Sequence, residues 1–77
     1  MARALSLAGE AVLRQGRAAD AAVLFLRAGR SALLQGDAPT GRLLLDRADQ
    51  LARQSGATDI SAEVERVKKA AAALPKT

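Results

Sequence analysis

A chain of 77 residues is long enough for one small domain, so we expect a single domain over residues 1–77. The chain has no cysteine and no histidine, which excludes disulfides, metal sites built on these ligands and imidazole-based catalysis. Twelve cations and eight acids give a net charge of +4, which favours acidic partners weakly. No apolar run approaches the roughly 18–20 residues of a membrane span, and charged residues interrupt the N-terminal segment. We therefore expect a cytoplasmic protein that does not enter a membrane.

Three glycines, Gly16, Gly36 and Gly56, are spaced 20 residues apart and divide the chain into four segments. The segments between them are rich in alanine and leucine, both of which favour helix. This repeat predicts an all-α fold, a small antiparallel array of four helices joined by short connections. The expected helices span about residues 3–14, 18–34, 40–54 and 59–74.

The first two predicted helices differ in how much of their circumference is apolar. The helix over 3–14 has one apolar stripe, which includes Ala8 and Val12. The helix over 18–34 is apolar on several sides, and Phe25, the only aromatic residue, lies on its main apolar face. A helix of that kind is covered by several neighbours. We therefore expect residues 18–34 to form the central helix, with Phe25 buried.

Capping residues precede the third and fourth helices. Asp37 or Thr40 is suited to cap the third helix, and Pro39 suits its first turn. The helix over 59–74 has a narrow apolar stripe that extends to Leu74. A narrow stripe is typical of a helix packed on one side, so we expect the fourth helix to cap the core.

Residues 2–33 resemble the tetratricopeptide repeat (TPR), a hairpin of two helices. Leu5 stands where the repeat usually has an aromatic residue, and no proline closes the unit near Leu34. The resemblance implies a TPR-like hairpin that binds a peptide or a partner helix through the exposed side of its first helix. The matching positions, which the family favours for small or aromatic residues, are Ala8-Gly9, Gln15-Gly16, Ala21, Phe25 and Ala28.

A second resemblance is to the three-helix MIT (microtubule-interacting and transport) domain. The segment Leu45-Asp46-Arg47-Ala48-Asp49-Gln50-Leu51 is similar to the Arg-Ala-acidic-x-Leu pattern in the third helix of that family. The first loop is shorter here than is usual for MIT domains. An unrelated helical bundle is the third alternative, and the sequence leaves the three open.

Catalysis is not expected from these residues. The carboxylates of Asp46 and Asp49 have cations beside them, a pattern that is typical of solvated surface charge. The serine and threonine hydroxyls have no base to activate them. The glycines are isolated and form no phosphate-binding loop. We therefore predict neither a cofactor nor a metal ion.

The leading hypothesis is a non-catalytic adaptor or scaffold that binds a protein partner. Its polar stripe on the first helix corresponds to the groove-facing side of a TPR-like hairpin. Because arginine forms bidentate hydrogen bonds with carboxylates, an acidic peptide is the expected ligand. Four leucines lie off the main apolar stripes and would form a patch if exposed together: Leu13, Leu24, Leu34 and Leu43. The predicted partner-binding residues are Arg3, Ser6, Glu10, Leu13, Arg14, Leu43, Asp46 and Asp49.

Two other functions remain open. A small nucleic-acid-binding bundle would show an affinity that falls steeply with salt. A self-associating bundle would join copies through the first helix, because a repeat hairpin leaves an apolar flank at an uncapped end. The arginines available for nucleic acid are Arg14, Arg17, Arg27 and Arg30.

Overall fold

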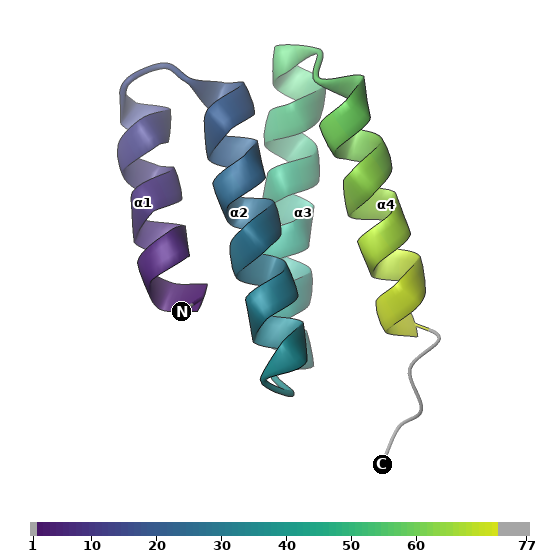
Figure 1. Ribbon diagram of the computed structural model, residues 1–77. Helices are drawn as coiled ribbons and strands as arrows, with labels where there is room; N and C mark the ends of the chain where they lie inside the picture. The colour runs from purple at the N-terminus through teal and green to yellow at the C-terminus, as the bar shows by residue number, and fades with distance from the viewer. Residues whose placement is uncertain (1, 73–77) are drawn as a thin grey trace.

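The computed structural model describes the backbone of residues 2–72 and the side chains of residues 7–72. This part of the chain forms four helices and no strand, which confirms the all-α fold (Figure 1). The bounds agree with the predicted ones to within two residues; positions 73 and 74, the predicted end of the last helix, lie outside the described residues. The helices are α1 (Ala2–Arg14), α2 (Ala18–Leu34), α3 (Ala38–Ser55) and α4 (Thr58–Ala72).

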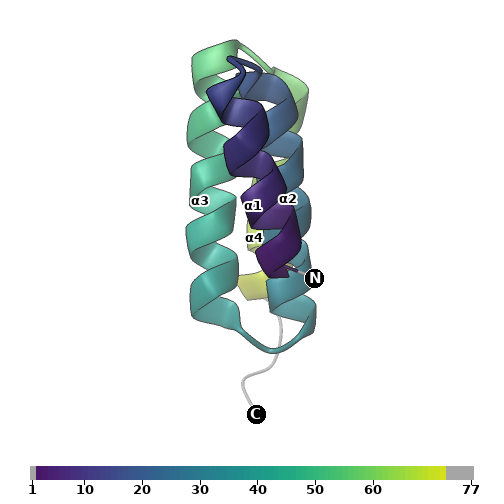
Figure 2. The ribbon, with the colours of Figure 1, turned by 90° about the vertical axis from the view of Figure 1, so that its left-hand side faces the viewer.

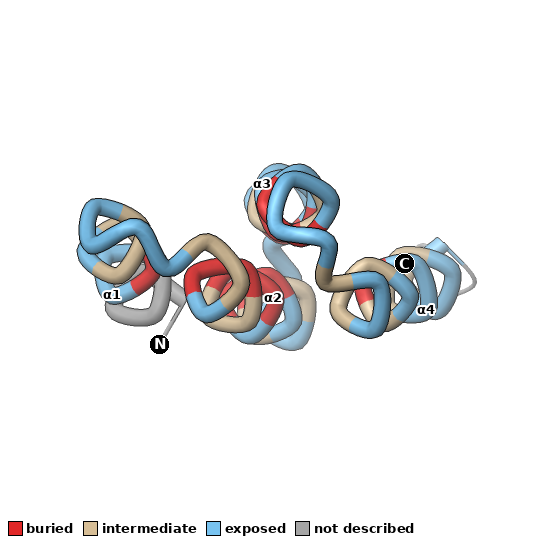
Figure 3. The backbone as a smooth tube through the Cα atoms, turned by 90° about the horizontal axis from the view of Figure 1, so that it is seen from above, coloured by how far each residue is buried: buried red, intermediate tan, exposed pale blue. Residues whose placement is uncertain are grey.

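The helices form a flat arrangement in which successive helices run antiparallel (Figure 1). Figures 2 and 3 show α1, α2 and α4 side by side in one layer, with α3 on one side of that layer, above α2 and α4. α2 packs against all three other helices, so the prediction of a central second helix is confirmed. α1 and α3 therefore run parallel to each other, α1 beside α2 within the layer and α3 above it.

One kind of turn ends each of the first three helices and accounts for the 20-residue repeat. Gly16, Gly36 and Gly56 have φ angles of 78°, 83° and 73°, a left-handed conformation that favours glycine. In the turn after α3, the N–H of Ala57 donates to the carbonyl of Ala52 at 2.8 Å. These bonds satisfy carbonyls that the end of a helix leaves without partners. The 20-residue repeat in the sequence thus reflects the same helix-ending turn used three times.

Asp37 caps α3, and its side chain provides a direct test of this local assignment. Its carboxylate accepts a hydrogen bond from the N–H of Thr40 at 3.3 Å, and Pro39 occupies the first turn. We expect Asp37→Ala to lower the free energy of unfolding by about 1 kcal/mol, because that N–H loses its acceptor. Asp37→Ser is the matched control, since its hydroxyl retains an acceptor. Urea denaturation followed by circular dichroism measures both, and equal losses in the two variants would contradict the cap.

The core is built mainly from α2 and α3, with one contribution from α4. Phe25, Leu45 and Val64 are its largest fully buried side chains among the residues described. Most of the other members are alanines, which bring the helix axes close together. The buried apolar residues are Ala21, Ala22, Phe25, Leu26, Ala28, Ala32, Leu45, Ala48, Leu51, Ala52 and Val64.

Two glycines face each other where α2 crosses α3. A Cβ atom on Gly29 would lie 2.9 Å from Cγ of Leu45 and 3.1 Å from the carbonyl oxygen of Gly41. A Cβ atom on Gly41 would lie 2.7 Å from Cγ of Leu33. Real Cβ atoms essentially never approach another atom within 3.0 Å, as two of these contacts would require, so the two glycines permit a short distance between the helices. This crossing fixes the relative position of α2 and α3.

α1 is rotated from the orientation that its apolar stripe predicted. Ala8 is exposed, whereas Gly9 is buried against the ring of Phe25, where a Cβ atom would lie 3.0 Å from Cε2. Val12 packs against the core as expected, and Leu13 also does so. The prediction for Ala8 was wrong because the missing side chain of Gly9 lets α1 approach α2 at that position.

Candidate interaction surface

An ion pair links α1 to α3 above the middle of α2. Nη2 of Arg47 lies 3.6 Å from Oε1 of Glu10, and the two side chains are 43% and 44% exposed. The guanidinium of Arg47 also lies over the ring of Phe25, with Cζ 5.7 Å from the ring centroid, within the range of a cation–π interaction. Arg47 therefore covers the buried aromatic ring and keeps half of its own surface open to a partner.

Two exposed leucines lie beside this ion pair. Leu7 precedes Glu10 by three residues, and Leu43 precedes Arg47 by four, so each lies one helical turn away on the same helix face. Because α1 and α3 run parallel, both leucines lie towards the same end of the ion pair. Leu7 is 65% exposed and Leu43 is 71% exposed.

A cation lies on the other side of the ion pair. Arg14 follows Glu10 by four residues on α1, is exposed, and has no ion-pair partner within residues 7–72. With Arg47 it gives this surface two cations against the one carboxylate of Glu10. We call the surface formed by Leu7, Glu10, Arg14, Leu43 and Arg47 the α1–α3 face.

The α1–α3 face contains three of the predicted partner-binding residues, Glu10, Arg14 and Leu43. Leu13 is half-buried and packs against the core. Arg3 and Ser6 lie outside the residues whose side chains the structure describes.

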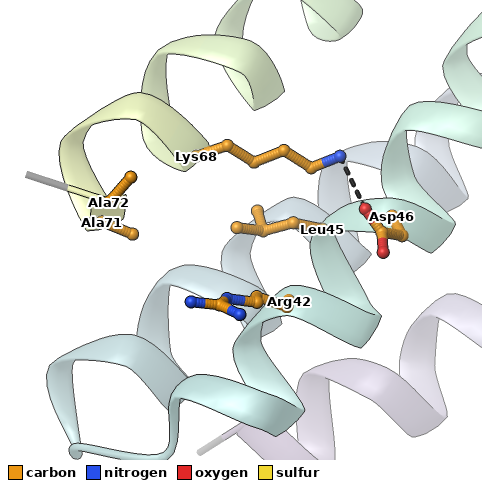
Figure 4. Close-up of a pocket in the computed structure, with 6 residues that line it drawn as sticks. All are labelled: Arg42, Leu45, Asp46, Lys68, Ala71 and Ala72. Carbon is orange, nitrogen blue, oxygen red and sulfur yellow. Dashed lines mark ion pairs between the residues drawn. The ribbon is translucent and has the colours of Figure 1, made fainter.

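Asp46 and Asp49 lie on the other side of α3 and attach it to α4. Oδ1 of Asp46 is 2.6 Å from Nζ of Lys68 (Figure 4). The carboxylate of Asp49 accepts a hydrogen bond from Oγ of Ser61 at 2.8 Å and lies 3.1 Å from Nε of Arg53. Both carboxylates are thus occupied within the chain, and the structure does not bring them together with the α1–α3 face.

A shallow hollow of about 210 Å³ lies between α3 and α4, next to the Asp46–Lys68 ion pair. Figure 4 shows Leu45 between Lys68 and Arg42, with Ala71 and Ala72 on the facing helix. The hollow combines an apolar wall with a neutralised ion pair and one additional cation. The carboxylate of Asp46 and the ammonium of Lys68 are paired with each other in this hollow, so each already has a partner within the chain.

The four arginines of the nucleic-acid alternative do not form one patch. Nη2 of Arg17 pairs with Oδ2 of Asp20 at 2.7 Å. Arg27 follows Phe25 by two residues, a rotation of about 200°, so it lies on the side of α2 opposite to the α1–α3 face. Arg30 is three residues further along the same helix, whereas Arg14 belongs to the α1–α3 face.

Sequence reasoning did not include Leu7 and Arg47 among the partner-binding residues. Leu7 was not expected to be exposed because its side chain is apolar, although it lies next to the polar stripe of α1. Arg47 follows Leu43 by four residues, and that spacing was the available signal. The four off-stripe leucines form no common patch, because Leu13 and Leu24 are half-buried and Leu34, nine residues after Phe25, lies on the side of α2 opposite to the α1–α3 face.

Comparisons with protein-family models, with curated proteins and with solved structures found no match to this chain. Within the described helices, none is both long and apolar enough to cross a membrane. In the same part of the chain, no three carboxylates come close enough together to hold a metal ion. The surface geometry therefore carries the functional argument.

Proposed function

We propose that this chain is a non-catalytic protein-interaction module, a TPR-like helical array that binds an acidic peptide or partner helix on its α1–α3 face. The observation that carries the proposal is the pair of exposed leucines, Leu7 and Leu43, beside the half-exposed Glu10–Arg47 ion pair. Exposed apolar side chains bordered by polar groups are typical of protein-binding surfaces.

The two leucines supply the apolar part of such a contact. They belong to α1 and α3, which the Glu10–Arg47 ion pair links, so a partner that lies across both helices buries both side chains. Burial of apolar surface contributes about 25 cal/mol per Å², and leucines at this exposure have most of their surface still to bury. The proposed occupant is therefore an amphipathic segment with aliphatic residues on one side.

The charges on the face define the rest of the partner. Arg14 is unpaired within residues 7–72, and the guanidinium of Arg47 is 3.6 Å from a single carboxylate oxygen. Arginine binds carboxylates in a bidentate geometry, which a planar fork of N–H donors provides. The excess of positive charge on the face thus favours glutamate or aspartate beside the aliphatic residues of the partner.

The test is a titration of the ¹⁵N-labelled chain with a short peptide of leucine and glutamate, followed by NMR. We expect amide shifts to be largest around Leu43 in α3 and around Glu10 in α1. Leu43→Asp removes an apolar contact and adds a repelling charge, so binding at this face should weaken at least about tenfold. Arg14→Glu should also weaken peptide binding at this face.

Lys69→Glu is the matched control, because it changes the net charge as Arg14→Glu does but lies on α4, away from the face. Binding should be close to that of the unchanged chain in this variant. Equal weakening in Arg14→Glu and Lys69→Glu would indicate nonspecific charge attraction and would contradict the proposal. DNA binding at low salt that displaces the peptide would favour the nucleic-acid alternative.

A further inference from the structure

A second apolar hollow, of about 270 Å³, lies between the C-terminal halves of α2 and α4. Its walls come from these two helices alone. Leu34, the last residue of α2, is 89% exposed at the edge of the hollow. The residues that line it are Arg30, Leu33, Leu34, Val67, Ala70 and Ala71. We call this site the α2–α4 hollow.

The hollow exists because side chains on the inner side of α4 become smaller along the helix. Ile60, Val64 and Val67 fill the space towards the core, but Ala71 takes the next position on that side. α3 covers the junction of α2 and α4 on one side of the layer only (Figure 3). The opposite side near the ends of the helices is therefore left open.

The outer side of α2 next to the hollow is positively charged. Arg27 and Arg30 are exposed and have no ion-pair partner within residues 7–72. Asp20, the one acidic residue of α2, is already paired with Arg17. A second copy of the chain docked here about a two-fold axis would bring arginines towards each other, so the charge favours an acidic partner over self-association.

The hollow is also too small for most cofactors. Pockets that hold drug-sized ligands measure about 300–1,000 Å³, which is larger than this one. An aliphatic side chain suits its size and its apolar walls better. We propose that the α2–α4 hollow is a second docking site, which takes an aliphatic side chain from an acidic partner segment whose carboxylates pair with Arg27 and Arg30.

This site is independent of the α1–α3 face. Leu34 follows Phe25 by nine residues, or two and a half helical turns, so the two residues lie on opposite sides of α2. One rigid partner helix cannot contact both surfaces at once. A chain with both sites occupied bridges two acidic segments, which is the action of a scaffold.

The experiment uses the full ¹⁵N-labelled chain and the same short leucine–glutamate peptide as probe. We expect a second group of shifted amides, around Arg30 in α2 and around Ala70 in α4. Leu34→Ser and Arg30→Glu should each weaken binding at this group about tenfold or more, while the shifts around Leu43 stay unchanged. Serine is chosen at position 34 because an acidic residue at the end of a helix opposes the helix dipole.

Two further variants separate loss of the site from loss of the fold. Ala70→Leu fills the hollow, so it should abolish these shifts without lowering the melting temperature. Lys69→Glu makes the same charge change as Arg30→Glu, but Lys69 lies on the side of α4 nearly opposite to Val67. This variant should therefore leave the amide shifts in place. Shifts that persist in both Ala70→Leu and Leu34→Ser would overturn the proposal.

Two other occupants would give distinct results. If a second copy fills the hollow, sedimentation will show a dimer that Leu34→Ser dissociates. If residues 73–77 of the same chain compete for it, Leu74→Asp will strengthen peptide binding many-fold. The dimer would overturn the acidic partner as the occupant. Stronger peptide binding in Leu74→Asp would still support it, because the peptide then takes the place of a competitor, and a monomer with unchanged affinity supports it as well.

Discussion

Phe25→Ala is expected to cost about 3–5 kcal/mol of unfolding free energy, the range for truncation of a buried aromatic side chain. The ring is 2% exposed and packs between α1 and α3. Gly9 approaches it from one helix and Arg47 covers it from the other. Small domains have total stabilities as low as about 5 kcal/mol, so this single change should leave a large unfolded fraction.

Chemical denaturation and amide hydrogen exchange measure the effect. Phe25→Leu is the control, since it keeps most of the apolar volume and should lose clearly less than Phe25→Ala. Exchange in the alanine variant should increase most in α1, because α1 packs on this part of α2 through Gly9 and Val12. A loss of less than about 1 kcal/mol would show that the ring is not central to the core.

Gly29→Val is the second change with a large expected effect. Its Cβ atom would meet Cγ of Leu45 at 2.9 Å and the carbonyl oxygen of Gly41 at 3.1 Å. The branched side chain adds two methyl groups beyond that clash, so α2 and α3 must move apart. We expect a loss of about 1–3 kcal/mol, the range for overpacking a filled core.

Arg27→Val is the matched control for this change. It places the same β-branched residue in the same helix, but at an exposed position, so it measures the effect of valine on helix propensity alone. Because glycine is a poorer helix former than arginine, helix propensity alone would make Gly29→Val the less costly change, so a larger loss in Gly29→Val in urea denaturation reports the cost at the crossing. Equal stability of the two variants would mean that α2 and α3 do not cross at Gly29.

The exposed surfaces should respond differently from these core positions. Leu34 and Leu43 are 89% and 71% exposed, so their substitution removes little buried surface. Variants at these positions are therefore expected to retain the fold while losing binding. This separation of stability from binding is what distinguishes an interaction surface from a part of the core.

The ends of the helices were predictable from the sequence because they depend on neighbouring residues. A left-handed glycine closes α1, α2 and α3, and Asp37 caps α3 through a residue three positions away. The central place of α2 was also predictable, since a helix that is apolar on several sides needs several neighbours. The TPR-like and MIT-like identities stay predictions, because no family model and no solved structure matches the chain.

The candidate surfaces were predictable only in part. Glu10, Arg14 and Leu43 lie on the α1–α3 face, but the pairing of Glu10 with Arg47 joins residues 37 positions apart. Asp46 could be recognised as a surface carboxylate, yet its partner Lys68 depends on where α4 lies. The sequence shows these charged residues but does not indicate which of them form ion pairs.

The sequence by itself determined where the helices begin and end, which helix is central and that Phe25 is buried, because local hydrogen bonds and apolar periodicity act within one helix. The tertiary structure alone decided which side chains remain exposed. Close contacts at Gly9, and between Gly29 and Gly41, set the rotation and spacing of α1, α2 and α3. Those contacts leave Leu13 half-buried, expose Ala8 and bring Glu10 to Arg47, since a rotation of one helix moves all of its side chains relative to its neighbours.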